Sequence, residues 1–231
     1  RGKLVCSTVN AKTFVIGSHI DTVVNAGKFD GPLGVIIGID LLEQIIQTKT
    51  KLPFNIELIA FCDEEGVRFQ TTFLGSKAVA GSFDKNILDK KDKNEITLRE
   101  AIHTIGGDAN NIKEDVIAAD NWLGYFEIHI EQGPVLYKKN IPIALVTAIA
   151  GQCRAAVTFT GVAGHAGTVP MDMRQDALSC ASEFVLATEA YALENKNNLV
   201  ATVGKLDVVH AAGNVIAGKV VCSLDVRSAD E

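Results

Sequence analysis

The chain is organised around the stretch Phe14-Val-Ile-Gly-Ser-His-Ile-Asp-Thr-Val-Val-Asn-Ala-Gly-Lys-Phe-Asp-Gly-Pro-Leu-Gly34. It starts as a short apolar run, which predicts a buried strand, and then delivers His19, Asp21 and Asp30 in quick succession. Glycines surround these side chains and let the backbone turn tightly. A buried strand that ends in a histidine and carboxylates is how α/β proteins present ligands. Two interpretations stay open, a metal site or a strand end with an Asp helix cap and a solvated histidine.

Length and composition are typical of a soluble globular protein. The chain has 231 residues, of which 47% are hydrophobic and 22% charged, and this allows one large domain or two of ordinary size. The net charge of -6 gives no support to a nucleic-acid or anionic-membrane partner. We find no signal-peptide pattern and no apolar run near the roughly 18 residues of a membrane span. The five scattered cysteines form no C-x-x-C, which predicts buried free thiols in a reducing, cytoplasmic compartment.

Alternating strand and helix patterns predict a mainly parallel α/β sheet in the first part of the chain. Apolar runs predict strands over residues 4–9, 13–18, 54–62 and 123–134. Helical spacing of apolar residues predicts helices over residues 34–47, 74–81 and 98–105. Residues 84–95 are rich in Asp, Lys and Asn, and this composition predicts a solvated loop.

After Pro142 the pattern changes to that of a second domain. We expect strands over residues 143–150, 153–161, 199–209 and 215–226, and a helix over residues 173–193. The order strand, helix, strand, strand is that of the start of a ferredoxin-like α+β module with one sheet face open. The predicted domains are therefore residues 1–147 and residues 148–231.

Ligand-type side chains follow three of the predicted strands, which favours the metal site. Glu64 and Glu65 follow the strand over 54–62, and His129 lies at the end of the strand over 123–134. Zn²⁺ and Mn²⁺ accept imidazole and carboxylate ligands and do not need cysteine. Because neighbouring side chains at a strand end diverge, one glutamate can bind metal while the other serves as general base. An exposed acidic turn is the alternative for this pair.

Five motifs, in this order along the chain, resemble those of the M20-type metallohydrolases. They are Gly17-Ser-His-Ile-Asp-Thr22, Lys28-Phe-Asp-Gly31, Asp63-Glu-Glu-Gly-Val-Arg-Phe69, His129-Ile-Glu-Gln-Gly-Pro134 and Gly164-His-Ala-Gly-Thr-Val-Pro-Met-Asp-Met-Arg174. The chain is most similar to the amidase (hydantoinase/carbamoylase) branch, which contains allantoate amidohydrolases, N-carbamoyl-L-amino-acid hydrolases and β-ureidopropionases. Residues 52–69 and 146–152 look most like the allantoate amidohydrolases. The resemblance implies a phosphorylase/hydrolase-like catalytic domain followed by a lid and dimerisation domain.

The resemblance also implies a site for two divalent metal ions, Zn²⁺ or Mn²⁺. Its metal ligands would be His19, Asp30, Glu65 and His129. The two histidines would bind one ion, Asp30 would bridge, and Glu65 would bind the second ion. Glu64 would be the general base.

Further roles follow from the same resemblance. Asp21 would orient the imidazole of the first ligand, and Gln132 would contact the substrate from the catalytic side. From the lid domain, His165 would stabilise the oxyanion of the tetrahedral intermediate. Asn214 and Arg227 would hold the substrate's carboxylate, for which an Arg fork is the expected partner. The alternatives without a functional role are that His165 is an ordinary loop histidine and that Arg227 forms a surface ion pair.

The expected function is that of a metal-dependent amidohydrolase that cleaves a ureido C–N bond of a small carboxylate. Allantoate is the expected substrate, giving ureidoglycine or ureidoglycolate, ammonia and carbon dioxide, and a homodimer through the lid domain is the expected assembly. N-carbamoyl amino acids, ureidopropionate and dipeptides are the alternative substrates, and a non-catalytic, truncated binding or dimerisation protein is the alternative class. The family's second metal site is completed by a late histidine that has no counterpart here. We therefore expect both domains to be incomplete and the chain alone to have little or no activity.

Overall fold

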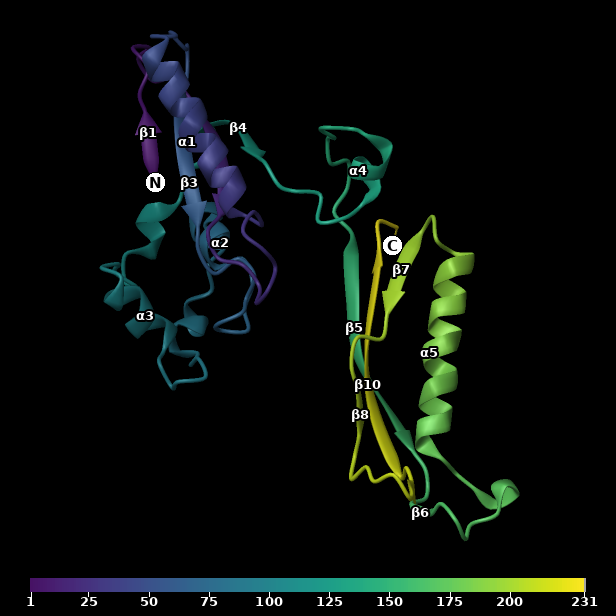
Figure 1. The fold of residues 1–231 in the computed structure, drawn as a ribbon. Helices are drawn as coiled ribbons and strands as arrows, with labels where there is room; N and C mark the ends of the chain where they lie inside the picture. The colour runs from purple at the N-terminus through teal and green to yellow at the C-terminus, as the bar shows by residue number, and fades with distance from the viewer. Residues whose placement is uncertain (231) are drawn as a thin grey trace. The chain divides into compact units, whose positions relative to one another are not determined.

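The computed structural model describes residues 1–230 of the chain. The backbone forms two compact units, the first covering Arg1–Pro142 and the second beginning at Ile143 (Figure 1). The sequence predicts this division a few residues later, after residue 147. Each unit has its own sheet and its own hydrophobic core, so the chain is a mixed α/β protein.

The first unit is built on a four-stranded sheet with the strand order β1-β3-β2-β4. Its strands are β1 (Gly2–Leu4), β2 (Thr13–His19), β3 (Asn55–Phe61) and β4 (Trp122–Glu127). β2 pairs in parallel with both β3 and β4, and β1 pairs antiparallel with β3 at one edge. Central β2 is almost fully buried, as its continuous apolar run predicts. This arrangement brings the carboxyl ends of three parallel strands to one end of the sheet.

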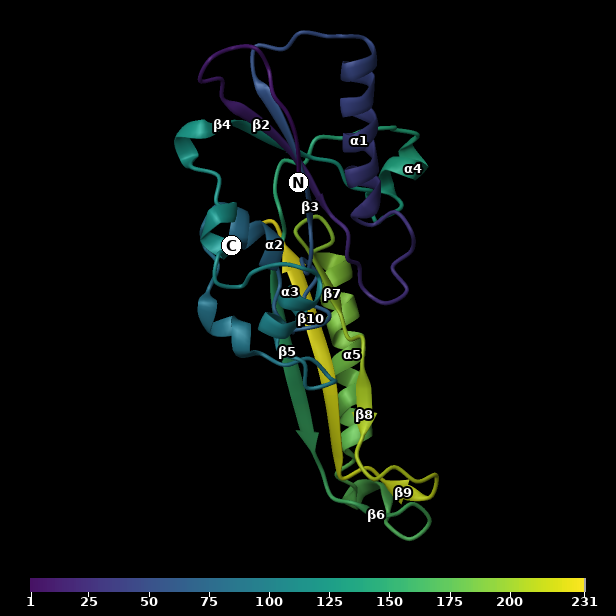
Figure 2. The ribbon, with the colours of Figure 1, turned by 90° about the vertical axis from the view of Figure 1, so that its left-hand side faces the viewer.

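Helix α1 (Pro32–Gln47) packs along one face of this sheet (Figure 2). Pro32 occupies the first turn, where the missing N–H would have no partner in the helix anyway. The close approach of helix and sheet depends on glycine, since a Cβ at Gly38 would lie 2.5 Å from Leu58 Cδ1. Leu58 and Ile16 form the buried layer beneath the helix. The helix thereby fixes the loop that precedes it.

Helix α2 (Leu74–Ala80) packs against the opposite face of the sheet. The other helices of the first unit that follow β3 are η1 (Lys85–Asp89), α3 (Leu98–Thr104), η2 (Ile112–Asp115), η3 (Ala119–Asn121) and α4 (Val135–Lys139). Val79 of α2 packs with Val15 and Phe61, whose side chains point away from α1 because residues alternate along a strand. A second cluster around Phe69 and Leu98 holds the short helices together.

Residues 84–95 are mostly exposed, as their composition predicts, but the segment contains the short helix η1 and two buried side chains. Leu88, in η1, is only 2% exposed, and Asp92 is 8% exposed. The Asp92 carboxylate accepts a hydrogen bond from Arg68 Nε at 2.9 Å and further hydrogen bonds from the N–H groups two and four residues later. These partners make a buried carboxylate tolerable. Composition alone cannot reveal a partner that lies so far away in the sequence.

Three predicted strands are shortened or absent. The strand predicted over residues 123–134 ends at Glu127, so His129 lies beyond it. The strand predicted over residues 4–9 ends at Leu4, and Val9 is 85% exposed. No strand forms over residues 143–150 in the described part of the chain, and Ile149 there is 91% exposed. An apolar segment becomes a strand only where a neighbouring strand completes its hydrogen bonds. Within residues 1–230, nothing pairs with this segment.

The second unit is an antiparallel sheet covered on one face by a helix (Figure 1). Its strands are β5 (Gly151–Thr160), β10 (Lys219–Ser228), β7 (Leu199–Thr202) and β8 (Leu206–Val208). β10 lies between β5 and β7, and β8 pairs with the first part of β10. Helix α5 (Ala177–Glu194) buries Ala181 against Val220 and Cys222 of the sheet. Among the described residues of the second unit, no helix covers the other sheet face.

A small ribbon lies beyond the end of the sheet at which β10 begins (Figures 1 and 2). It consists of β6 (Gly164–His165) and β9 (Val215–Ile216), which pair antiparallel, and η4 (Met171–Met173) follows it. The Gly161 N–H donates to the carbonyl oxygen of Gly218 at 2.9 Å and ties the ribbon to the sheet. A ferredoxin-like fold for this unit stays a prediction.

Two composition-based expectations can be compared with the fold. No helix among residues 1–230 has the length and apolar character that crossing a membrane requires. All five cysteines are free, as predicted, but the expectation that they are buried holds only for Cys222. Cys62, Cys153 and Cys180 are exposed. The apolar character of a thiol is therefore not enough to place it in a core.

Candidate metal centre

His19, the last residue of central β2, is a buried histidine with a defined proton. Its side chain lies in the sheet interior with 5% of the residue exposed. Its Nδ1 lies 2.5 Å from the backbone carbonyl oxygen of Asp21. Because a carbonyl oxygen only accepts, Nδ1 carries the proton and donates it, and Nε2 keeps a free lone pair. The loop can pass this close to the ring only at glycine, since a Cβ at Gly31 would lie 2.4 Å from Nδ1.

Asp30 is a carboxylate that the fold buries almost completely, immediately before α1. It is 1% exposed, and the Thr22 hydroxyl donates a long hydrogen bond of 3.4 Å to its Oδ2. Among residues 1–230, no lysine or arginine forms an ion pair with it, and the nearest ionisable nitrogen is Nδ1 of His129 at 3.8 Å. A buried carboxylate with so few partners is costly unless a cation offsets its charge.

His129 follows β4 by two residues and brings a second imidazole to Asp30. Its Nε2 lies 2.9 Å from Oε1 of Glu127, the last residue of β4. An ionised carboxylate only accepts, so Nε2 carries the proton and Nδ1, on the Asp30 side, keeps its lone pair. The rings of His129 and His19 lie with their centroids 5.1 Å apart.

These three residues form a group that suits a divalent cation. One ligand atom from each of His19, Asp30 and His129 lies within 4.8 Å of the other two. Two imidazole lone pairs and a buried carboxylate, without cysteine, are a donor set that Zn²⁺ and Mn²⁺ accept. The residues present therefore fit a metal ion.

Asp21 joins two strand ends. Its carboxylate accepts hydrogen bonds from the N–H groups of Glu64 at 3.1 Å and Glu65 at 3.0 Å. The same carboxylate lies 4.0 Å from Nδ1 of His19, and the atom that accepts from the imidazole is the backbone carbonyl. Asp21 thus contacts the ring through its main chain and fixes the acidic turn through its side chain.

The two adjacent glutamates point to different partners. The Glu64 carboxylate accepts from the backbone N–H and from the hydroxyl of Ser76, both at 2.7 Å. Burial raises the pKa of the Glu64 carboxyl, the Ser76 hydrogen bonds oppose that rise, and the charges of Asp21 and Glu127 add to it. Glu65 instead approaches the metal-site group, with its Oε1 3.9 Å from Nε2 of His19.

Glu127 is the residue at this site that sequence reasoning missed. One of its oxygens accepts from Nε2 of His129, and the other accepts from the hydroxyl of Tyr125. The spacing Tyr-x-Glu-x-His puts all three side chains two residues apart, and residues so spaced share one face of an extended chain. That spacing was the available signal. Gln132, in contrast, is exposed and has a left-handed backbone with φ 52°.

In the second unit, His165 and Asn214 lie together in the ribbon. Nδ1 of His165 accepts the Gly167 N–H at 3.0 Å, so its proton sits on Nε2, which is left as a donor. His165 is the register partner of Val215, and the Asn214 carbonyl accepts the N–H of Ala166 at 2.9 Å. Both site residues are exposed.

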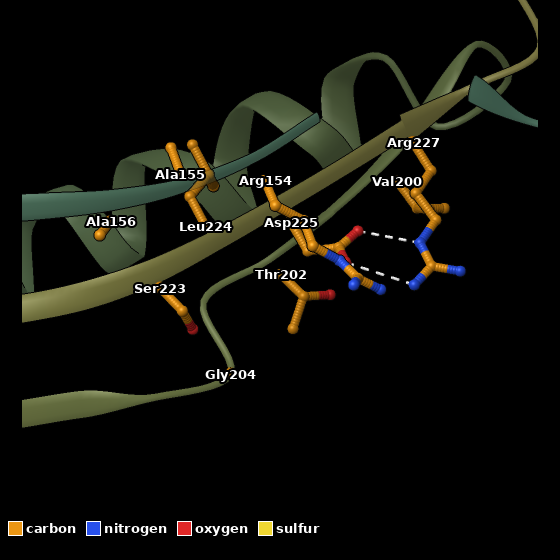
Figure 3. Close-up of a pocket in the computed structure, with 10 residues that line it drawn as sticks. All are labelled: Arg154, Ala155, Ala156, Val200, Thr202, Gly204, Ser223, Leu224, Asp225 and Arg227. Carbon is orange, nitrogen blue, oxygen red and sulfur yellow. Dashed lines mark hydrogen bonds and ion pairs between the residues drawn. The ribbon is translucent and has the colours of Figure 1, made fainter. Parts of the chain in front are cut away.

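Arg227 lies far along β10 from that ribbon. Eight residues separate it from Lys219, where β10 begins, which at about 3.3 Å a residue is roughly 26 Å. The Arg227 fork is engaged by Asp225, with Nε to Oδ1 at 2.9 Å and Nη2 to Oδ2 at 3.2 Å (Figure 3). Arg154 of β5 donates to the same carboxylate at 2.9 Å.

On the open sheet face around Asp225, one carboxylate is paired with two arginines. Figure 3 shows the residues that line this face, which are Arg154, Ala155, Ala156, Val200, Thr202, Gly204, Ser223, Leu224, Asp225 and Arg227. The hydrogen bonds from Arg227 and Arg154 lower the pKa of Asp225 from 3.8 to about 2. The chain is thus an α/β protein whose candidate metal group lies at the carboxyl ends of parallel strands and whose second sheet carries paired surface charges.

Comparison with known proteins agrees with this class. Residues 15–221 match the family described as peptidase family M20/M25/M40, and the chain belongs to this family. It is 40% identical over 253 residues to allantoate deiminase 2 of Glycine max, covering 100% of the chain and 52% of that protein. It is 39% identical over 229 residues to the N-carbamoyl-L-amino-acid amidohydrolase of Pseudomonas sp. (strain NS671), covering 98% of the chain and 55% of that protein.

A solved structure extends the similarity to the fold. The crystal structure of a hydantoinase/carbamoylase family amidase from Burkholderia ambifaria superposes with a TM-score of 0.87 and 32% identity. The match covers 99% of this chain and 56% of that one. The chain therefore spans about half the length of the relatives that it matches. Its resemblance to the amidase branch of the family is confirmed.

Proposed function

We propose that this chain forms part of a metal-dependent amidohydrolase that cleaves a ureido C–N bond of a small carboxylate, with allantoate as its substrate. The observation that carries the proposal is the group of His19, Asp30 and His129, in which two imidazoles lie close to a buried carboxylate with no Lys or Arg partner among the described residues. The similarity to allantoate deiminase 2 over the whole chain supports the choice of substrate.

Two divalent ions, Zn²⁺ or Mn²⁺, are the proposed cofactor. His19, through Nε2, and His129, through Nδ1, would hold the same ion. Asp30 would be a ligand of both ions. Glu65 would hold the second ion, and its Oε1 reaches the metal-site group, 3.9 Å from Nε2 of His19. Bound metal of this kind acidifies water and polarises a carbonyl group.

Glu64 is the proposed general base. Its carboxyl group takes a proton from water as the ureido carbon is attacked and returns it to the leaving nitrogen. The raised pKa that burial gives this carboxyl makes it a better proton acceptor than an ordinary surface glutamate. Ser76 holds both oxygens in place, so the carboxylate needs no reorganisation before proton transfer.

The lid residues would bind the substrate. The free Nε2–H of His165 is a donor for the oxyanion, and Asn214 beside it is a second polar contact. Arg227 would release Asp225 and bind the substrate's carboxylate, which can accept the same pair of hydrogen bonds from the guanidinium. Gln132 would contact the substrate from the catalytic side.

The separation within the second unit supports a homodimer. His165 and Asn214 lie beyond the end of the sheet at which β10 begins, and Arg227 lies roughly 26 Å along β10 from that end, so one subunit cannot bring all three to a single small substrate. We infer that each substrate is held by His165 and Asn214 of one subunit and Arg227 of the other.

Complementation tests this dimer. Full-length His165→Ala and Arg227→Ala proteins should each be inactive, and mixing and reassembling them should restore about a quarter of wild-type activity, because half of the dimers are mixed and each has one intact site. A mixture that stays as inactive as its components would contradict the shared site.

A substrate panel on the full-length protein with added Mn²⁺ or Zn²⁺ tests the proposed reaction. Allantoate should be turned over with the highest kcat/KM. The 39% identity to an N-carbamoyl-L-amino-acid amidohydrolase makes N-carbamoyl amino acids the second candidate. Preference for these, for ureidopropionate or for dipeptides would overturn the substrate. Absence of turnover by the full-length, metal-loaded protein would favour a binding or dimerisation role.

The chain of 231 residues alone is proposed to be inactive, since it spans about half of its relatives. It should nevertheless bind metal. Metal content by elemental analysis should fall in His19→Ala and stay at the wild-type level in His103→Ala, whose imidazole is exposed on α3. Equal metal content in both variants would refute the site.

A further inference from the structure

Glu127 is a carboxylate that the proposed mechanism does not use. It ends β4, opposite Gly17 of the central strand, and its two oxygens have separate partners. Oε1 lies 2.9 Å from Nε2 of His129, and Oε2 accepts from the hydroxyl of Tyr125. A side chain held at both oxygens has its direction fixed.

The contact with Glu127 decides which nitrogen of His129 is free. A neutral imidazole carries one proton and one lone pair, on different nitrogens. With Nε2–H donated to Glu127, the lone pair must sit on Nδ1, which is the nitrogen 3.8 Å from Asp30 Oδ1. Without the carboxylate the proton could occupy either nitrogen, and the ring could rotate.

The sheet supplies the space for this arrangement. A Cβ at Gly17 would lie 2.9 Å from the Tyr125 hydroxyl oxygen and 2.6 Å from the ring of Phe61, so only glycine lets Tyr125 occupy its position. Tyr125 then lies two residues before Glu127, on the same face of β4.

The location of Glu127 would be unfavourable without a cation. It adds a further negative charge close to Glu64, whose pKa is raised by burial and, to a smaller extent, by the charge of Glu127. A neutral amide or a backbone carbonyl oxygen would be enough to hold the His129 ring by a hydrogen bond. A carboxylate in this position instead increases the basicity of the imidazole and adds negative charge beside a cation site.

We propose that Glu127 is a positioning residue for the metal centre, holding the His129 imidazole with Nδ1 facing Asp30, and that Tyr125 in turn holds Glu127. This inference rests on the proposed metal function. It concerns residues that act through His129 and do not themselves touch metal or substrate.

Metal affinity of the whole chain tests the inference, and the chain offers a matched control. Glu131, like Glu127, lies two residues from His129, but its carboxylate accepts from the Leu136 N–H at the start of α4. In competition titrations with Zn²⁺ or Co²⁺, Glu127→Gln and Glu127→Ala should weaken binding by about 10- to 100-fold. Tyr125→Phe should cause a smaller loss, and Glu131→Gln should stay within about two-fold of wild type.

A spectroscopic readout separates positioning from a merely structural role. In the metal-free wild-type chain, ¹⁵N chemical shifts of the His129 ring should report a proton on Nε2, and in Glu127→Ala they should report a mixture of both tautomers. Far-UV circular dichroism should be unchanged in the isosteric Glu127→Gln. Wild-type tautomer and wild-type affinity in Glu127→Ala would overturn the proposal, as would an equal loss of affinity in Glu131→Gln.

The outcome is distinguishable from failure of the proposed function. If His19→Ala and Asp30→Asn lose metal while the Glu127 variants keep it, the metal centre stands and the positioning role is wrong. If none of these variants changes the affinity, the metal centre itself is wrong.

Discussion

The two units each carry a cluster of charged and polar side chains on a sheet, and the clusters differ in what remains unmatched. On the second sheet, Asp225 accepts from two arginines, and every partner is on the exposed face. At the first sheet, Asp30 is buried without a Lys or Arg partner among the described residues, and two imidazoles lie close to it. The ion-paired groups of the second sheet are solvent-exposed, whereas a buried carboxylate without a cationic partner indicates a bound cation. The comparison therefore favours the first cluster as the metal centre.

The largest effect should come from Asp30→Asn, which keeps the shape and removes the charge. We expect metal affinity to fall by more than about 100-fold, because a ligand is lost. Asp92→Asn is the control, since Asp92 is also a buried carboxylate but pairs with Arg68. It should lower thermal stability and leave metal affinity unchanged. Titration calorimetry and thermal melts of both variants measure this, and metal loss in Asp92→Asn alone would reverse the comparison.

A smaller effect should come from Gly31→Ala. Gly31 has φ 83°, and an added Cβ would lie 2.4 Å from Nδ1 of His19. Gly27→Ala is a matched control, because Gly27 has φ 96° but nothing within 4 Å of an added Cβ. Both variants should lose about 1–2 kcal/mol of stability from backbone strain. Only Gly31→Ala should also weaken metal binding, by about 10-fold, because it displaces a ligand.

Denaturant unfolding and metal titration of the two glycine variants separate strain from displacement. Equal metal affinities in the two proteins would show that the loop does not position the imidazole.

The smallest effect should come from Asp225→Asn on the second sheet. The arginine hydrogen bonds lower the pKa of Asp225 to about 2, so the ionised carboxylate stabilises the fold above its ordinary pKa of 3.8. That contribution should be lost as the pH falls from about 4 to about 2. The difference in unfolding free energy between wild type and Asp225→Asn should therefore shrink over this range, and it should be reduced by salt because the pair is exposed.

Metal affinity should not change in Asp225→Asn. A stability difference that persists at pH 2, or a loss of metal binding, would contradict the view that Asp225 only forms exposed ion pairs with Arg154 and Arg227.

Much of the first unit could be predicted from local patterns. The buried strand β2, helix α1 and strand β3 each follow from a continuous or helical run of apolar residues. The convergence of His19, Asp30 and His129 could also be predicted, because parallel strands end at the same edge of a sheet.

Some of the remaining features depend on contacts that no local pattern contains. The burial of Asp92 depends on Arg68, which is distant in the sequence. The orientation of the His129 ring depends on Glu127, for which the spacing Tyr-x-Glu-x-His was the available signal. Residues 143–150 have a strand-like sequence, but a strand also needs a partner, and no described residue provides one. The pairing of Arg227 with Asp225 had a sequence signal, since residues two apart on a strand share a face.

The most direct test of the metal centre is an anomalous-scattering map from crystals of this chain grown with Zn²⁺ or Mn²⁺. The account predicts a peak within about 2.0–2.2 Å of Nε2 of His19, Nδ1 of His129 and a carboxylate oxygen of Asp30. A map without a peak among these three side chains, at metal concentrations that saturate the chain, would contradict it.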